Sequence, residues 1–292
     1  MDNKIILITG ASSGIGKETA LTLAKQGHTV IIHGRDAEKT KAVFDEILQK
    51  TGNKNLDMMT ADLSLTSEVG SFADKVKAKY ERIDVLINNA GGQFGTKREV
   101  TAEGHEKTMA INLLAPFLLT YLLLDTLAKS PAARVVTVSS ESYRMGGEPN
   151  INDIELRNSY TMGRAYGLSK RYVFWIMRRF VEEAKRLGIA NITFNTAEPG
   201  STKTDLARIS GQGLMFKIIL LLWKPMEWSI DKAAATSIYL ATSQEVEGVT
   251  GKFYGNCKEK DIKPKYISIY GEKAIWDYCM AACKRFIGEE TI

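Results

Sequence analysis

Three absences narrow the class of protein. The 292 residues contain three cysteines, Cys257, Cys279 and Cys283, and three histidines, and these do not share the spacing of a metal site. An odd number of late cysteines is typical of reduced thiols in a cytosolic protein, so we expect no metal and no disulfide framework. Cys279 and Cys283 lie one helical turn apart, which favours core packing over redox chemistry.

Long apolar runs and long basic runs are also missing. No uninterrupted apolar stretch reaches the roughly 18 residues of a membrane-spanning helix. A strand-like pattern begins by Ile5, which leaves no room for a signal peptide or an N-terminal anchor. The net charge is +5, from 39 basic and 34 acidic residues spread along the chain, which indicates a solvated surface without nucleic-acid binding. We expect a cytoplasmic protein without a transmembrane anchor.

Short apolar runs alternate with amphipathic stretches along the whole chain. Continuous apolar strands separated by helices predict a parallel sheet covered on both faces. No linker, low-complexity stretch or repeat divides residues 1–292, so the fold class expected is α/β, one doubly wound (Rossmann) domain. Strands are expected at 4–9, 29–33, 55–60, 83–88, 134–139, 191–197 and 251–254, and helices at 14–26, 36–51, 66–79, 101–128, 163–187 and 229–242.

A glycine-rich turn, TGASSGIGKETA (9–20), lies between the first strand and the first helix. Glycines there permit a tight turn and a close approach of backbone to a pyrophosphate, which the helix N-terminus attracts. Many such turns only form corners, so position in the α/β pattern carries the prediction. The residues expected to contact a dinucleotide are Gly10, Ser12, Ser13, Gly14, Ile15 and Gly16.

The turn and four further motifs together resemble the short-chain dehydrogenase/reductase family. After it come NNAG (88–91), Ser140, Y-x-x-x-K (166–170) and PG (199–200), in the family's order over residues 1–255. A 25-residue insert (141–165), expected to border the substrate mouth, and the segment FYGNCKEK before a Trp-bearing terminal helix resemble the retinol-dehydrogenase-like branch. The resemblance implies an oxidoreductase that transfers a hydride between a nicotinamide cofactor and a carbonyl or alcohol.

The end of the second expected strand, HGRD (33–36), bears on the choice of cofactor. Gly34 aligns with the acid that holds a ribose 2′-hydroxyl in NAD-binding folds, and the guanidinium of Arg35 suits a 2′-phosphate. The pattern favours NADP(H) over NAD(H). Two other readings stay open: Asp36 caps the next helix, or Asp36 binds the ribose and selects NAD.

The resemblance places further segments around the cofactor. It implies that Asp62 and Leu63 contact the adenine ring, although helix N-capping near Ser64 or Thr66 fits this segment nearly as well. It places Asn89, Ala90 and Gly91 beside the adenosine, although Asn is also a common turn residue. After the sixth strand, Pro199, Gly200 and Thr204 are the family's contacts to the nicotinamide carboxamide or diphosphate.

Two tyrosines compete for the role of proton donor. Tyr160 precedes Arg164 and Tyr166 precedes Lys170, each by one helical turn. The polar stretch before Gly163 predicts a helix beginning at 161–164, so Tyr160 should precede it. Tyr166 should stand on the rigid helix, with Lys170 lowering the pKa of its phenol. We expect Tyr166 as general acid and base, and Lys170 as its partner and ribose ligand.

Two polar residues complete the expected catalytic set. The family places its catalytic serine second in the pair Ser139-Ser140, so Ser140 should polarise the substrate oxygen. Asn112 lies among apolar residues, where an amide must find partners; a structural hydrogen bond and the family's water relay to lysine both fit. The alternatives to an NADP(H) enzyme are an NAD-dependent dehydrogenase and a non-catalytic nucleotide-sensing regulator.

Two apolar segments follow the expected site. The stretch GLMFKIILLLWKPMEW (213–228) suits a substrate lid spanning about 205–228, a membrane-surface helix or an interface. The family places its variable lid here, which favours a small apolar substrate. A helical extension is expected at about 271–288. Members of the family often pair through the helices at 101–128 and 163–187, so the resemblance allows a homodimer, while the C-terminal extension could block larger assemblies.

Overall fold

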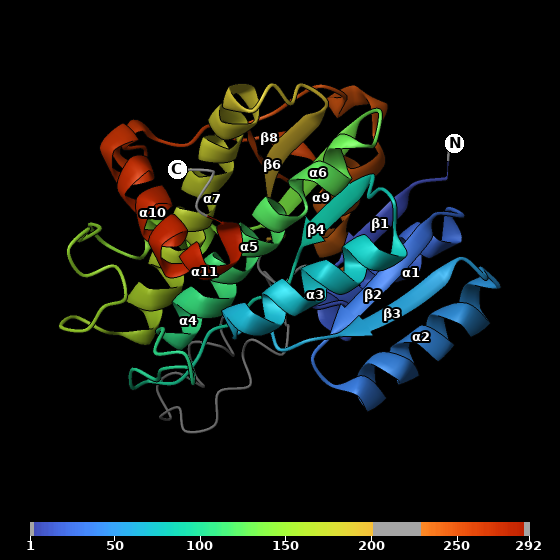
Figure 1. The fold of residues 1–292 in the computed structure, drawn as a ribbon, viewed down its shortest axis with the longest axis horizontal. Helices are drawn as coiled ribbons and strands as arrows, with labels where there is room; N and C mark the ends of the chain where they lie inside the picture. The colour runs from blue at the N-terminus through green and yellow to red at the C-terminus, as the bar shows by residue number, and fades with distance from the viewer. Residues whose placement is uncertain (1–2, 201–228, 289–292) are drawn as a thin grey trace.

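The computed structural model describes residues 3–200 and 229–288, and within them one eight-stranded sheet runs in the order β3-β2-β1-β4-β5-β6-β7-β8 (Figure 1). The first seven strands pair in parallel, and β8 pairs antiparallel to β7. The doubly wound sheet predicted from the sequence is confirmed, while β8 was not predicted. The strands are β1 (Ile5–Ile8), β2 (Thr29–Gly34), β3 (Leu56–Thr60), β4 (Val85–Asn88), β5 (Ala133–Val138), β6 (Ile192–Glu198), β7 (Phe253–Gly255) and β8 (Lys258–Glu259).

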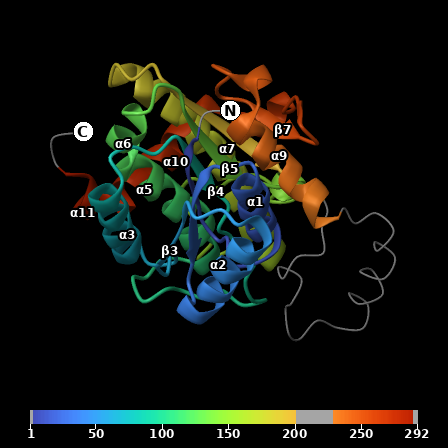
Figure 2. The ribbon, with the colours of Figure 1, turned by 90° about the vertical axis from the view of Figure 1, so that its right-hand side faces the viewer.

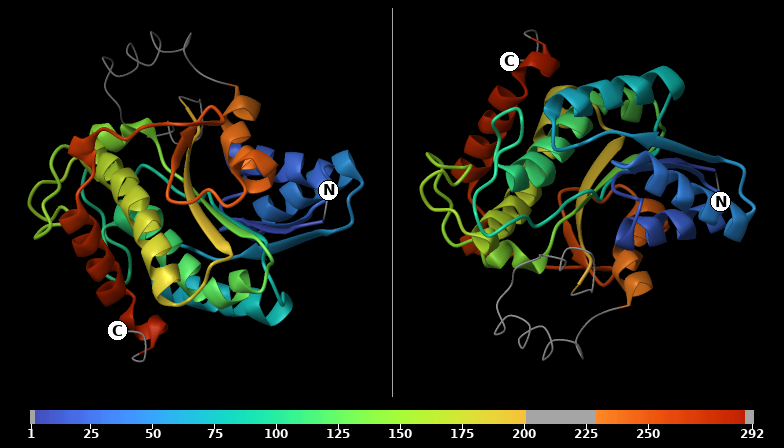
Figure 3. Two further views of the ribbon diagram at one scale, coloured as in Figure 1. Left: turned by 90° about the horizontal axis from the view of Figure 1, so that it is seen from above. Right: turned by 90° about the horizontal axis from the view of Figure 1, so that it is seen from below.

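Helices cover both faces of the sheet, as Figures 2 and 3 show. On one face lie α1 (Gly14–Lys25), α2 (Ala37–Thr51) and α9 (Ile230–Thr242), which pack over one hydrophobic cluster. On the other lie α3 (Thr66–Lys79), α5 (Ala115–Leu122) and α7 (Met162–Arg186). The central strands are therefore apolar on both sides; Ile6, Leu7 and Ile8 of β1 are all fully buried.

The strand order reverses between β1 and β4. The chain runs outward from β1 to β3, then returns to the other side of β1 to form β4 and continues to β7. At such a reversal the loops that follow neighbouring strands diverge, and a crevice opens at the carboxyl ends of the strands. The predicted glycine-rich turn follows β1 and NNAG spans the end of β4, so both motifs meet there.

The long helix expected at 101–128 is wrong in its start and its continuity. Residues before Lys107 form a turn with Gly104 at φ 86°, and the Glu106 carboxylate caps the first turn of α4 (Lys107–Met109). A π-helical turn, η1 (Ala110–Leu114), separates α4 from α5, and α6 (Leu124–Ala128) follows a break. The apolar run does not distinguish a straight helix from a broken one, because every piece of it is buried.

The C-terminal extension forms two helices, α10 (Ile269–Ala282) and α11 (Lys284–Ile287), where one was expected at 271–288. Helix α10 lies along α7 (Figure 3), and its Trp276 meets Phe117 of α5 and Phe180 of α7 edge-on at 5.1 and 4.9 Å between ring centres. Cys279 and Cys283 are fully buried in this cluster, which confirms core packing. Burial raises the pKa of Cys283 to about 12, so its thiol is inert.

The expected lid at 205–228 and the expected cofactor contact Thr204 lie outside the described residues. Within residues 3–200 and 229–288, none of the helices combines the length and apolarity that crossing a bilayer requires.

Candidate active site

A cleft of about 400 Å³ opens at the carboxyl ends of the strands where their order reverses. Most residues predicted from the sequence line it: Gly10, Ser12, Ser13, Gly14, Ile15, Gly16, Arg35, Asp62, Leu63, Asn89, Ala90, Gly91, Tyr166, Lys170 and Pro199. Asn112, Ser140 and Gly200 are not among the lining residues. Further lining residues belong to none of the predicted contacts: His33, Ala61, Gly92, Gln93, Phe94, Ile111, Val138 and Ser139.

The glycine-rich turn needs its glycines for space and for conformation. Gly10 and Gly14 have φ of 65° and 54°, which other residues rarely adopt. A Cβ on Gly10 would lie 2.8 Å from the Cα of Ala90, and one on Gly16 would lie 2.4 Å from the Gly10 carbonyl oxygen. Ser13 makes no side-chain cap to α1, so the first amides of this helix remain available to a phosphate. The turn therefore fits a dinucleotide pyrophosphate.

The NNAG segment packs directly against this turn. The Asn89 amide donates to the carbonyl oxygens of Thr9 and Gly10 at 2.9 and 3.1 Å, and the Thr9 hydroxyl oxygen accepts from the amide nitrogens of Asn89 and Ala90 at 3.0 Å. These bonds link the ends of β1 and β4 into one wall of the cleft. Asn89 therefore has a structural role as well as its predicted place beside the cofactor.

His33 of β2 supports the glycine-rich turn through a hydrogen bond to Gly10. In the sequence, only its polarity within an apolar strand indicates this role. His33 is 2% exposed, its Nδ1 accepts from the Gly10 amide at 3.2 Å, and its Nε2 lies 3.2 Å from the carbonyl oxygen of Ala61. The two partners require the neutral ring with the proton on Nε2. Burial lowers its pKa to about 4, so the ring stays neutral at physiological pH.

The last residue of β2 is Gly34, where NAD-binding folds carry an acidic side chain. A Cβ there would lie 2.1 Å from the hydroxyl of Thr40 and 2.9 Å from Cβ of Ser12. The Asp36 carboxylate accepts from the Lys39 amide at 2.9 Å and caps α2, which is the helix-capping alternative of the sequence analysis. The side chain of Arg35 is 73% exposed and reaches to 4.0 Å from the Asp62 carboxylate.

Asp62 lines the cleft and stabilises the turn before α3. Its Oδ1 accepts from the amide and the hydroxyl of Ser64 at 3.0 and 2.7 Å. It does not cap the helix, because the N-cap of α3 is Leu65 and the amides of Thr66 and Ser67 donate to Glu103. The helix-capping alternative for Asp62 is therefore wrong, and its second carboxylate oxygen faces Arg35.

Asn112 lies in the π-helical turn η1, and its buried amide is engaged with neighbouring groups. Its Oδ1 accepts from the Gly92 amide and its Nδ2 donates to the Gly92 carbonyl, both at 2.9 Å, and Nδ2 also donates to the Ser169 hydroxyl at 3.0 Å. A Cβ on Gly91 would meet both Asn112 Oδ1 and Lys170 Nζ, at 2.9 and 3.3 Å. Asn112 thus positions the segment that borders Lys170.

The competition between the two tyrosines is decided by where α7 begins. Thr161 caps the helix at Met162, so Tyr160 precedes it, as the sequence indicated. The Tyr160 hydroxyl donates to the Gly95 carbonyl at 2.9 Å, and the Arg164 guanidinium donates to the carbonyls of Gly146 and Glu148. The pair has separate partners and holds loops together.

Tyr166 and Lys170 face the cleft from the first turns of α7. Lys170 is buried, its ammonium donates to the Val138 carbonyl at 2.9 Å, and it lies 5.7 Å from the centre of the Tyr166 ring. Burial lowers the pKa of Lys170 to about 8.

The expected lowering of the Tyr166 pKa is wrong for this structure. Burial raises the pKa of Tyr166, the hydrogen bond with Ser140 lowers it, and the charge of Glu198 raises it further. The ammonium of Lys170, which was expected to lower this pKa, donates to the Val138 carbonyl. The phenol is therefore held in its protonated form.

The two serines after β5 have different partners. Ser139 is buried and its hydroxyl donates to the Lys170 carbonyl at 2.8 Å, which anchors the strand end to α7. The Ser140 hydroxyl accepts from the Ser142 amide at 3.2 Å and bonds the Tyr166 side chain. Of the two serines, Ser140 is therefore the one whose side chain interacts with that of Tyr166.

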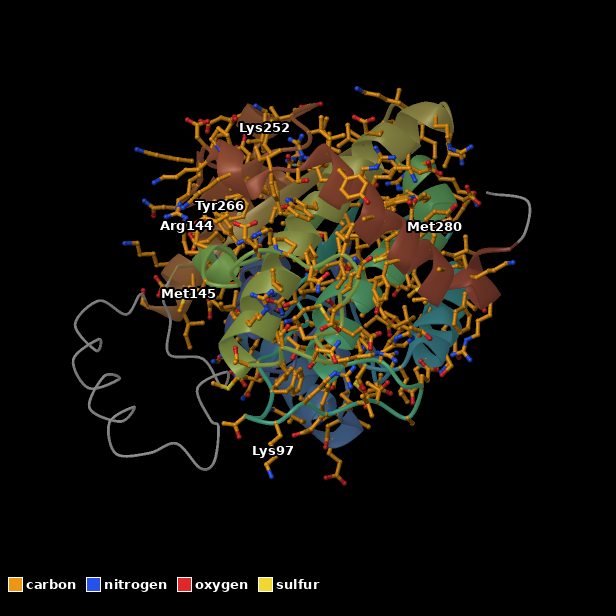
Figure 4. All side chains as sticks on the ribbon, turned by 90° about the vertical axis from the view of Figure 1, so that its left-hand side faces the viewer. Lys97, Arg144, Met145, Lys252, Tyr266 and Met280 are labelled. Atoms are coloured by element: carbon orange, nitrogen blue, oxygen red, sulfur yellow. The ribbon has the colours of Figure 1, made fainter. Side chains whose placement is uncertain are left out.

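The insert at 141–165 is anchored at both ends. It opens with a 3-10 turn, η2 (Glu141–Arg144), and Arg171 of α7 donates to the carbonyls of Tyr143 and Gly147. Arg144 and Met145 lie at the surface (Figure 4), and the ring of Tyr143 meets that of Tyr266 at 5.3 Å between centres.

The far end of the insert is held by a buried carboxylate. Glu155 bonds His105 at 2.8 Å, the Tyr278 hydroxyl at 2.6 Å and Arg98 at 3.2 Å. Burial opposes its charge, but these hydrogen bonds bring the pKa of Glu155 down to about 2. The insert is thereby fixed to α10 and to the segment before α4.

Comparisons with known proteins agree with this arrangement. The family model described as short chain dehydrogenase matches residues 4–213. Human retinol dehydrogenase 14 is 35% identical over 95% of this chain and 85% of the relative, and human retinol dehydrogenase 12 is 34% identical over the same shares. A putative short chain dehydrogenase from Escherichia coli, solved in complex with NADPH, is 25% identical, superposes with a TM-score of 0.68, and covers 88% of this chain and 98% of its own.

Proposed function

Because the chain belongs to the short-chain dehydrogenase family, and to its retinol-dehydrogenase-like branch, we propose that it is an oxidoreductase that interconverts a carbonyl compound and an alcohol with NADP(H). The observation that carries the proposal is that Tyr166 and Lys170 line one glycine-rich cleft and that Ser140 bonds the Tyr166 side chain. The reaction is balanced as carbonyl plus NADPH plus one proton giving alcohol plus NADP⁺.

The described residues fit a dinucleotide along the cleft. The first amides of α1 suit the pyrophosphate because no side chain caps them. The turn from Gly10 to Gly16 is packed so tightly that Gly10 and Gly16 have no room for a side chain, and the absence of side chains there lets the backbone approach a ligand closely. Asp62, Leu63 and Asn89 to Gly91 would border the adenosine, and the Lys170 ammonium would bond the nicotinamide ribose. When bound, NADPH supplies the hydride that reduces the carbonyl carbon.

Tyr166 supplies the proton. Its raised pKa keeps the phenol protonated near neutral pH, which is the form needed to donate to the substrate oxygen. The Ser140 hydroxyl donates a hydrogen bond to the same oxygen and stabilises its developing negative charge. Lys170, buried and cationic, stabilises the phenolate that remains, and Asn112 holds the Gly91–Gly92 segment beside it.

The choice of NADP(H) rests on three features at the end of β2. Position 34 has no room for an acidic side chain, the Asp36 carboxylate caps α2, and the exposed Arg35 has the geometry to pair with a 2′-phosphate. The related Escherichia coli protein was solved with NADPH, which agrees. An NAD-dependent dehydrogenase is the alternative that these features disfavour.

An apolar substrate is supported by the cleft and by the relatives. Phe94 and Ile111 line the same cleft as Tyr166, and the two relatives reported above are named for retinol, a long apolar alcohol. A regulator without catalysis would not need Ser140, Tyr166 and Lys170 around one cleft. We therefore favour an enzyme over a nucleotide sensor.

The test is NADPH oxidation with a panel of apolar aldehydes and ketones. Tyr166→Phe should lower turnover by about 10²-fold or more, the range for loss of a general acid, while NADPH binding by nicotinamide fluorescence persists. Tyr160→Phe is the matched control and should keep turnover, since the Tyr160 hydroxyl bonds Gly95 and Thr108 and Tyr160 is not among the residues that line the cleft. Turnover of Tyr166→Phe near the wild-type level would refute the catalytic assignment. Tighter binding of NADH than of NADPH would overturn only the cofactor choice.

A further inference from the structure

Lys260, just after β8, connects two segments of the active site that are distant in sequence. Its ammonium lies 3.0 Å from Oε1 of Glu141 and 3.0 Å from Oε2 of Glu198. Glu198 is 2% exposed, so its carboxylate needs a cationic partner to offset the cost of burying the charge. Lys260 is that partner.

The path of Lys260 depends on a glycine. Gly255 of β7 is paired in register with Glu198 of β6, and a Cβ on it would lie 2.5 Å from Cε of Lys260 and 2.7 Å from Oε2 of Glu198. Because Gly255 has no side chain, the Lys260 side chain can pass over it and reach the buried carboxylate of Glu198. The three residues therefore form one constructed contact.

Each carboxylate holds a segment that flanks Tyr166. Oε1 of Glu198 accepts from the Gly200 amide at 2.5 Å, which fixes the turn through Pro199, a residue that lines the cleft. Glu141 directly follows Ser140, whose hydroxyl bonds the Tyr166 side chain. One ammonium thus joins the serine segment to the turn after β6.

We propose that Lys260 is a positioning residue for the oxidoreductase reaction, which holds the Ser140 segment and the Pro199–Gly200 turn together and balances the charge of Glu198 beside Tyr166. This inference rests on the proposed function for its effect on turnover. Nothing in the motifs of the sequence singles out Lys260, because its two partners lie 119 and 62 residues away.

The electrostatic effect has a defined sign. Lys170 lies on the helix of Tyr166, and the charge of Glu198 at the end of β6 acts on its phenol. Lys260 bonds both Glu198 and Glu141, and Glu141 also pairs with Arg144 at 3.0 Å. Partial burial opposes the charge of Lys260, but the bonds with Glu198 and Glu141 prevail and raise its pKa, so it is cationic. Removing this cation leaves the Glu198 charge unbalanced and makes ionisation of Tyr166 harder.

The experiment compares Lys260→Met with Lys252→Met. Lys252 is a matched control because it lies at the surface (Figure 4) and its half-exposed side chain forms an ion pair with Glu259 at 2.7 Å. For alcohol oxidation with NADP⁺, where Tyr166 must be ionised, we expect the rising limb of the pH–rate profile to move up by roughly one pH unit in Lys260→Met, the effect of a charge removed nearby. Lys252→Met should keep the wild-type limb, and coincidence of the Lys260→Met and wild-type limbs would refute the proposal.

A second variant separates the effect of the unbalanced Glu198 charge from a general loss of folding in Lys260→Met. In Glu198→Gln/Lys260→Met the amide oxygen still accepts from Gly200, and the unbalanced charge is gone, so the limb should return toward wild type. A double variant shifted as far as Lys260→Met overturns the charge-balancing role. If the wild-type protein turns over no carbonyl or alcohol, the proposed function fails by itself. The ionisation of Tyr166, read by phenolate absorbance against Tyr166→Phe, then tests Lys260 alone: an upward shift in Lys260→Met supports the proposal and no shift overturns it.

Discussion

Acidification should weaken the folded protein through His33, which supports the cofactor-binding turn. Burial lowers its pKa from about 6.5 to about 4. As the pH falls below 6.5, the unfolded chain binds a proton at this histidine and the folded chain does not. The free energy of unfolding therefore falls between about pH 6.5 and pH 4.

The magnitude follows from the size of the shift. At about 1.4 kcal/mol per pKa unit, a change from 6.5 to 4 corresponds to roughly 3 kcal/mol of stability lost across this window. The pKa of His28 is also lowered, chiefly by burial, and adds a loss of the same sign. Glu103 and Glu155 have pKa values of about 2, so their contributions are lost only at lower pH.

The assay is urea unfolding of the wild type, His33→Gln and His28→Gln at a series of pH values from about 7 to 4.5. Glutamine keeps one donor and one acceptor but does not titrate in this range. We expect His33→Gln to be less stable near neutral pH, with a flatter decline on acidification, while His28→Gln keeps the His33 contribution. Parallel declines for the wild type and His33→Gln would refute the reasoning, because the titration would then belong to other groups.

Two further predictions test specificity and assembly. Gly34→Asp should destabilise the protein by about 1–3 kcal/mol and should fail to improve NADH binding, because the added Cβ would overlap the Thr40 hydroxyl. Adding Thr40→Ala should recover part of that stability in urea unfolding. A Gly34→Asp protein as stable as the wild type would contradict this prediction. Because α10 covers α7 and part of α5, we expect a monomer near 32.4 kDa by light scattering, and twice that mass would favour the helix-paired dimer that the family resemblance allows.

The sequence alone predicted where β1 to β7 lie along the chain, because apolar runs and breaks are local properties. It also predicted most of the cleft, since the glycines at 10, 14 and 16 and the NNAG segment follow strand ends whose position the alternation defines. The selection of Tyr166 over Tyr160 rested on the onset of α7, which a local polar stretch and the Thr161 cap determine. These features depend on neighbours within a few residues.

Tertiary structure decided what depends on distant neighbours. His33 supports Gly10 only because β1 and β2 pair in this register, and Lys260 reaches Glu141 and Glu198 only because β7 lies beside β6 with a glycine at the contact. The direction of the Tyr166 pKa was also decided by packing. Tyrosine and lysine one turn apart indicate a lowered pKa, but burial of the phenol and the partner chosen by Lys170 reverse that expectation. Desolvation depends on everything that surrounds a group, and the spacing of two residues along the chain does not contain that information.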